Sequence, residues 1–223
     1  MIRVSDGFRT AFPGARLGFL AMTGVANPEA HPLLEQRKAE IEQNLREQFR
    51  DFERPRFKQL PVIRAYDAHY GKFNKSYHVL LQLESVALKG KPIPRVAALV
   101  EAMFMAELKN LLLTAGHDLD KVTQPLTLGV SAGGETYVGI RGKTETCKPG
   151  DMMITDGEGI ISSVLYGPDA RTCITAQTNA VLFTVYSPVG VSQDAVRAHL
   201  RDIEDYARLA SPQAVMQAAE VLY

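Results

Sequence analysis

An imidazole and two carboxylates stand close together in the middle of the chain. The segment Ala115-Gly-His-Asp-Leu-Asp120 carries His117, Asp118 and Asp120. Such groups could ligate a metal ion, or pair as a general base and the group that orients it. Asp118 could instead cap backbone amides while His117 makes a structural hydrogen bond. We predict His117, Asp118 and Asp120 as candidate catalytic residues, with the structural role as the alternative.

A second polar segment combines a turn with a cation. It reads Tyr166-Gly-Pro-Asp-Ala-Arg-Thr172, and its Gly-Pro pair favours a turn. Arg171 could hold a phosphate or a carboxylate of a ligand. A contact between Asp169 and Arg171 that braces the turn explains the same residues equally well.

Positive charge is concentrated between Arg54 and Arg95. This segment holds nine basic and two acidic residues, a net charge of +7 in a chain whose total is zero. The aromatic residues interleaved with them are Phe57, Tyr66, Tyr70, Phe73 and Tyr77. Cations beside rings suit a single-stranded RNA end, because phosphates need cations and splayed bases need flat partners. We predict Lys72, Lys75, Lys89 and Lys91 as RNA-binding residues; the alternative is a solvated surface with half-buried tyrosines.

Hydrophobic spacing and chain breakers predict the elements that position these residues. In the first half, we expect a strand over 16–25 and helices over 32–52, 76–88 and 96–113. Ser76 is the expected cap of the second helix, and the third is almost solidly apolar, which predicts a buried central helix.

The second half is expected to begin with strands and end with helices. Residues 126–130 and 137–140 predict a hairpin around Gly133-Gly134, and residues 152–165 predict a second hairpin. A buried strand follows over 181–186. Two helices close the chain, one capped by Ser192 and one beginning at Ser211-Pro212.

Composition limits the class of protein. The chain has 223 residues, of which 46% are hydrophobic and 22% charged, which excludes wholesale disorder. The longest nearly apolar run, residues 17–25, is too short to span a bilayer. Cys147 and Cys173 form no Cys-x-x-Cys pair and no metal quartet, so we expect reduced thiols in a cytoplasmic protein. We expect one α+β domain over residues 1–223, with no metal, no cofactor and no membrane partner.

The stretch from Pro94 to Val122 resembles a known domain, the B3/B4 tRNA-editing module of the phenylalanyl-tRNA synthetase β subunit. That family reads roughly P-x-V-N-N-x-V-D-x-T-N-Y, then P-L-H-A-F-D-x-D-K-L. The positions that match are Pro94, Val96, Val100, Leu108, Asp118, Asp120 and Lys121, with Val122 for the final Leu. Residues 12–28, 151–166 and 174–188 are similar to other strands and hairpins of the module, in the same order.

The resemblance implies a fold and a function. The fold is a β-sandwich-like core with helices packed around it, with the module core over about residues 12–190 and the predicted helices over 191–223. The protein is similar to free-standing B3/B4 proteins, which carry this module alone. In the synthetase, the module hydrolyses tyrosine wrongly attached to the phenylalanine tRNA.

The editing residues of the family are not retained in this sequence. Met103-Phe104 replace its Thr-Asn pair, Ala115 replaces its histidine, and no Glu or Asp stands near residues 183–185. Met103, Phe104 and Ala115 therefore predict an apolar ligand pocket without tyrosine editing, and Arg171 is a further candidate pocket residue that could hold an anionic group. We expect a module that binds RNA, tRNA or an aminoacyl-tRNA-like ligand. The alternatives are a deacylase for another aminoacyl-tRNA, and a small-molecule enzyme or interaction domain unrelated to tRNA.

Overall fold

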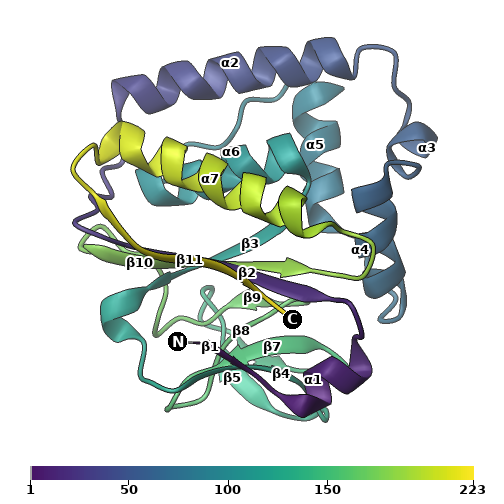
Figure 1. Ribbon diagram of the computed structural model, residues 1–223. Coiled ribbons are helices and arrows are strands. Elements are labelled where there is room, and N and C mark those ends of the chain that lie inside the picture. The colour runs from purple at the N-terminus through teal and green to yellow at the C-terminus, as the bar shows by residue number, and fades with distance from the viewer. Residues whose placement is uncertain (1) are drawn as a thin grey trace.

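Helices cover one face of a four-stranded sheet, and a second sheet lies against its other face (Figure 1). The computed structural model describes residues 2–223. Two stacked sheets with helices packed around them confirm the expected α+β class. Within the described residues, no helix is long and apolar enough to cross a membrane.

The four-stranded sheet forms the middle layer. Its order is β11 (Val215–Leu222), β2 (Arg16–Thr23), β10 (Ala180–Ser187) and β3 (Leu113–Asp118), with every neighbouring pair antiparallel. The two central strands are mostly apolar because both of their faces are covered. The strands expected over 16–25 and 181–186 are thereby confirmed.

The second sheet has five strands. They are β1 (Ile2–Val4), β4 (Leu126–Val130), β7 (Met152–Thr155), β8 (Ile160–Ser163) and β9 (Gly167–Pro168), in that order. The hairpin expected over residues 152–165 is confirmed as the antiparallel β7–β8 pair.

The hairpin expected around Gly133-Gly134 is wrong. Strand β4 pairs with β1 and β7, while β5 (Thr136–Val138) pairs with β6 (Thr144–Thr146) in a small separate sheet. The Glu135 carboxylate accepts hydrogen bonds from the amides of Ala132 and Gly133. These bonds hold the chain in a local loop that leads away from β4.

Residues 2–223 contain seven α-helices, of which α1 lies against β4 of the second sheet and the others lie on or beside the middle sheet (Figure 1). They are α1 (Asp6–Ala11), α2 (Pro32–Gln48), α3 (Arg54–Phe57), α4 (Pro61–Gly71), α5 (His78–Ala87), α6 (Ala98–Asn110) and α7 (Gln193–Ala210), with a 3-10 turn η1 (Leu119–Lys121). The expected helices α2, α5, α6 and α7 are all present. Ser192 caps α7 as predicted, because its Oγ accepts a hydrogen bond from the Ala195 amide.

Two expectations about helix ends are wrong. Ser76 does not cap α5; the capping position is Tyr77, which makes no side-chain capping bond. Helix α6 ends at Asn110 and not at residue 113, because Leu111 has a left-handed backbone (φ 61°) and Leu113 begins β3.

The prediction of a second closing helix from Ser211-Pro212 is also wrong. Residues 191–223 form one helix and one strand, and not the two helices that were expected. Residues 215–222 form strand β11, which pairs with β2 along the sheet edge. The Ser211 hydroxyl accepts a hydrogen bond from the Ala26 amide at 2.8 Å and caps no helix. Pairing with a preformed strand overrides the helix propensity of Ala, Gln and Glu.

Buried polar groups hold the junction between α6 and β3. The Glu107 carboxyl accepts a hydrogen bond from the Thr114 amide at 2.7 Å. The Tyr66 hydroxyl accepts one from the Leu113 amide at 2.9 Å. The Tyr77 hydroxyl donates to the Leu111 carbonyl at 2.9 Å. Burial raises the pKa of Glu107 to about 8, although the Thr114 amide acts in the opposite direction.

This pKa predicts a pH-dependent stability. The folded chain keeps a proton on Glu107 that the unfolded chain, with its ordinary pKa of 4.5, has released. This contribution to stability is therefore present below pH 4.5 and is lost as pH rises toward 8. The Glu107→Gln variant should flatten this loss and raise the free energy of unfolding at pH 9 by up to about 5 kcal/mol. Urea denaturation between pH 5 and 9 measures the free energy of unfolding of both proteins. The Glu40→Gln variant, at an exposed site, is the control. If the free energy of unfolding depends on pH in the same way for Glu107→Gln and for the native protein, the prediction is contradicted.

Candidate functional site

His117 lies in strand β3 and is fully buried between the two large sheets. Its Nδ1 lies 2.8 Å from the Thr172 hydroxyl, which donates a hydrogen bond to Asp169. Burial lowers the pKa of His117 to about 4, so its imidazole is neutral at physiological pH. Its Nε2 has no hydrogen-bond partner among residues 2–223. The imidazole is thus held in a buried polar chain.

Asp118 and Asp120 do not share a site with His117. Successive residues of a strand point to opposite faces, so the Asp118 side chain points away from the face that holds His117. Asp118 accepts hydrogen bonds from the Asp120 amide (3.2 Å) and the Thr178 hydroxyl (2.8 Å), and thereby caps η1. The Asp120 side chain is exposed. Residues 2–223 contain no cluster of three or more His, Cys, Asp and Glu side chains that could hold a metal ion.

Arg171 is occupied by contacts within its own chain. Its Nη2 lies 2.8 Å from Asp156 Oδ1, and its Nη1 donates to the Lys121 carbonyl at 2.9 Å. The Arg171 Nε also lies 3.8 Å from Asp169 Oδ2. This is the contact within the turn that was the alternative to ligand binding in the sequence analysis. Burial pushes the pKa of Asp156 upward, but the Thr123 amide and Arg171 outweigh it and the net shift is downward.

Met103, Phe104 and Ala115 do not line a common pocket with Arg171. A Cβ added to Gly116 would meet Met103 Sδ at 3.5 Å and Ile174 Cδ1 at 2.6 Å, so apolar atoms fill that face of β3. Ala115 is buried on the opposite face, and Phe104 is half-buried against the core. The structure therefore separates these predicted pocket residues.

The four predicted RNA-binding lysines fall into two groups. Lys72 and Lys75 lie between α4 and α5, whereas Lys89 and Lys91 follow the far end of α5. A ten-residue helix is about 15 Å long, so the groups are well separated. Other cations of the basic segment are paired: Arg54 contacts Glu84, and Arg95 contacts Glu35.

A groove of about 620 Å³ lies beside the first pair of lysines. We call it the Lys72–Lys148 groove, and its lining residues are Ala11, Phe12, Gly71, Lys72, Phe73, Asn74, Lys148, Pro149 and Gly150. The Lys72 Nζ lies 5.7 Å from the centroid of the Phe12 ring, and the Lys148 Nζ donates to the Phe73 carbonyl at 3.2 Å. No lining residue is acidic, so the groove favours anions.

Two charged groups next to the groove affect its electrostatics. The Lys75 Nζ lies 3.8 Å from the centroid of the Tyr166 ring, and burial together with the Lys148 charge lowers the Lys75 pKa. Asp151 follows Gly150 and is fully buried, which raises its pKa to about 7, although the Ser163 hydroxyl acts in the opposite direction. Near pH 7 the carboxyl is therefore partly protonated and only partly offsets the positive charge.

Sequence reasoning missed Phe12 and Lys148 as partners of Lys72. They come from the end of α1 and from a loop after β6, both far from the basic segment along the chain. The dipeptide Pro149-Gly150 after Lys148 signalled a turn, but nothing in the sequence indicated that this turn approaches α4.

The buried position of His117 predicts a structural effect of its removal. His117→Ala should lower the free energy of unfolding by about 2–4 kcal/mol, because it leaves a cavity and removes the partner of the Thr172 hydroxyl. Asp120→Ala, at an exposed site, should change it by less than about 0.5 kcal/mol. Thermal and urea denaturation measure both variants. Native-like stability of His117→Ala would contradict the structural role.

Comparison with known proteins agrees with the predicted resemblance. Residues 72–222, more than half of the chain, match the B3/4 domain family. The phenylalanine–tRNA ligase beta subunit of Mycoplasma pneumoniae is 30% identical over 106 residues, which are 47% of this chain and 13% of that protein. This chain therefore corresponds to a small part of that relative.

A solved structure is also similar. It is the crystal structure of an N-terminal fragment of the phenylalanyl-tRNA synthetase beta subunit from Pyrococcus horikoshii, with a TM-score of 0.49 and 10% identity. The similarity covers 99% of this chain and 50% of that chain. The family match spans β3, the Arg171 contacts and both lysines of the groove. The chain belongs to the B3/4 domain family.

Proposed function

We propose that this protein binds the single-stranded end of an RNA, with tRNA as the partner, at the Lys72–Lys148 groove. The observation that carries the proposal is the meeting of two lysines and two phenylalanines along one groove without an acidic lining residue. Cations bind the phosphates, and an exposed ring face stacks on an unpaired base.

The two phenylalanines have different tasks in this proposal. Phe12 is buried, 8% exposed, and packs against Phe8 and His69, so it supports the groove wall. Phe73 is half-buried and lies at the loop between α4 and α5, where part of its ring is accessible to a base. Lys75 beside Tyr166 extends the positive charge away from the groove.

The relatives support tRNA as the partner. The curated relative is named as a phenylalanine–tRNA ligase beta subunit, and its name implies that it acts on tRNA. This chain covers only 13% of that protein, so we carry over the kind of partner and not the ligase activity.

Buried polar groups favour binding over hydrolysis. Ester hydrolysis needs a general base that reaches both water and substrate. His117 is fully buried, while Asp118 and Arg171 are occupied by internal contacts. Among the residues predicted for the deacylase alternative, the Asp120 carboxylate is exposed, but it shares no site with His117 or Asp118 that could orient it as a base.

Removing the groove cations tests the proposal. Lys72→Ala/Lys148→Ala should weaken binding of a labelled single-stranded oligoribonucleotide and of tRNA. The slope of log affinity against log salt should flatten by about 1.4, the loss expected for two contacts to a single strand. Fluorescence anisotropy between about 50 and 200 mM salt measures both quantities.

The matched control is Lys89→Ala/Lys91→Ala, which removes the same charge beyond the far end of α5. Native-like affinity of this variant places binding at the groove. Equal losses for the two variants would contradict a localised site and favour a diffuse basic surface.

Phe73→Leu tests base stacking separately from charge. The substitution keeps an apolar side chain but removes the flat ring, so affinity for the single strand should fall at least about fivefold. Affinity for inorganic polyphosphate, which has no bases, should not change. Equal affinities of the variant and native protein for the single strand would exclude stacking on Phe73.

A panel of aminoacyl-tRNAs, including tyrosine on the phenylalanine tRNA, separates binding from catalysis. We expect the purified protein to bind these tRNAs without accelerating their deacylation. Rapid hydrolysis of any one of them would overturn the proposal of binding alone and support the deacylase.

A further inference from the structure

Strand β11 leaves one edge of the middle sheet unpaired. It is the outermost strand next to β2 and runs beneath α7 (Figure 1). Apart from the ladder with β2, no backbone hydrogen bond joins residues 215–222 to another part of the described chain. The outer N–H and C=O groups of such a strand can pair with another strand.

The common protections of an edge strand are few here. Natural edges are blunted by charged side chains, above all lysines, by prolines, by bulges or by short length. Of these, β11 has one charged residue, Glu220, and one bulge, at Gln217. The sequence Val-Met-Gln-Ala-Ala-Glu-Val-Leu of β11 has eight residues, no lysine and no proline. Val215 and Met216 are 55% and 44% exposed, which is unusual for apolar residues of a strand.

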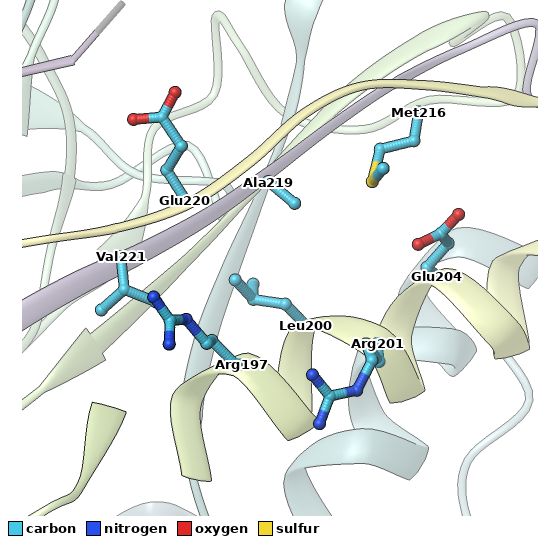
Figure 2. Close-up of a pocket in the computed structure, with 8 residues that line it drawn as sticks. All are labelled: Arg197, Leu200, Arg201, Glu204, Met216, Ala219, Glu220 and Val221. Carbon is cyan, nitrogen blue, oxygen red and sulfur yellow. The ribbon is translucent and has the colours of Figure 1, made fainter. Parts of the chain in front are cut away.

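A groove of about 530 Å³ runs along this edge between β11 and α7 (Figure 2). Met216, Ala219 and Val221 line it from the strand, and Arg197 and Glu204 line it from the helix. The close-up shows Arg197 beside Val221 at one end of the groove and Glu204 beside Met216 at the other. Helix α7 therefore presents a guanidinium at one end and a carboxylate at the other, with Glu220 also lining the groove and Arg208 bound to Glu204.

A register shift at Gln217 gives the strand an internal symmetry. Residues 216 and 218 pair with consecutive residues of β2, so Gln217 is the extra residue of a bulge. Without Gln217, seven residues of β11 pair with β2, and Ala219 is the fourth of them. Met216 and Val221 lie symmetrically about it on the face toward α7, and Val215 and Leu222 lie symmetrically on the opposite face.

We propose that β11 pairs antiparallel with β11 of a second copy of this chain, around a two-fold axis at Ala219. This register sets Met216 opposite Val221 of the second copy, and Val215 opposite Leu222 of the second copy. These two pairs set apolar residues opposite apolar residues, Ala218 lies opposite Glu220 of the second copy, and the small side chain of Ala219 lies on the axis. The two four-stranded sheets become one continuous sheet of eight strands.

The charges of α7 complement each other under the same rotation. A two-fold axis at Ala219 exchanges the Met216 end with the Val221 end, so Glu204 comes to face Arg197 of the second copy, twice per dimer. Glu204 binds Arg208 through Oε1 at 2.8 Å and keeps Oε2 for this contact. Arg201 is exposed near the axis and adds like charge there, so we expect a weak dimer, with a dissociation constant on the order of micromolar.

Reciprocal charge reversal tests the proposal in the full chain. Sedimentation velocity should show a monomer–dimer equilibrium for the native protein between about 1 and 100 µM, a range that brackets a micromolar constant. Arg197→Glu and Glu204→Arg should each weaken association at least tenfold, and the double variant should restore it. Arg50→Glu, at an exposed site far from β11, is the control for net charge, and circular dichroism checks folding.

Hydrogen exchange locates the contact. Amides of residues 215–222 should exchange more slowly at high protein concentration than at low concentration. A monomer at every concentration would overturn the proposal and leave the edge for an extended peptide of another protein. A dimer that is insensitive to both charge reversals, or whose β11 amides exchange at one rate, would overturn it as well.

Discussion

The reversal of the chain between α6 and β3 depends on buried hydroxyl and carboxyl groups, and much of the molecule is arranged around it. Leu111 adopts a left-handed conformation that a non-glycine residue avoids without support. The Tyr77 hydroxyl donates a hydrogen bond to the Leu111 carbonyl. The Tyr66 hydroxyl and the Glu107 carboxyl accept hydrogen bonds from the amides two and three residues further along the chain. The rings of the two tyrosines stack with their centroids 4.2 Å apart. Because these groups come from three helical segments, the position of β3 is tied to the packing of the helical layer on the sheet.

The position of β3 determines the surroundings of His117, the most prominent candidate catalytic residue of the sequence. Alternation along the strand sends His117 and Ala115 toward the second sheet and Gly116 toward α6. Burial between two sheets then requires that each polar side chain finds partners within the protein. The Thr172–Asp169 pair and the Asp156–Arg171 contact supply such partners, whereas His117 Nε2 has none among residues 2–223. Residues suited to catalysis by type are thus used for cohesion between the layers.

Groups that are free to bind a partner lie instead at the surface of the protein. The Lys72–Lys148 groove gathers positive charge where α1, the α4–α5 loop and the loop before β7 meet. The outer edge of β11 retains free backbone groups and exposed apolar side chains. The groove is the proposed site for an anionic chain and the strand edge is the proposed site for another strand. The two surfaces share no residue, so mutations can address each one separately.

Hydrophobic spacing in the sequence alone determined the buried strands over 16–25 and 181–186, the helices α2, α5, α6 and α7, the hairpin over 152–165 and the α+β class, because local periodicity reports which face of an element is buried. It did not indicate the shorter helices α1, α3 and α4. It did not determine that residues 215–222 form a strand, since their local propensity is helical and only pairing with β2 makes them extended. Nor could it bring Phe12 and Lys148 to Lys72, or divide Lys72 and Lys75 from Lys89 and Lys91. Such groupings depend on contacts between residues distant in the chain, and these exist only after the layers have packed.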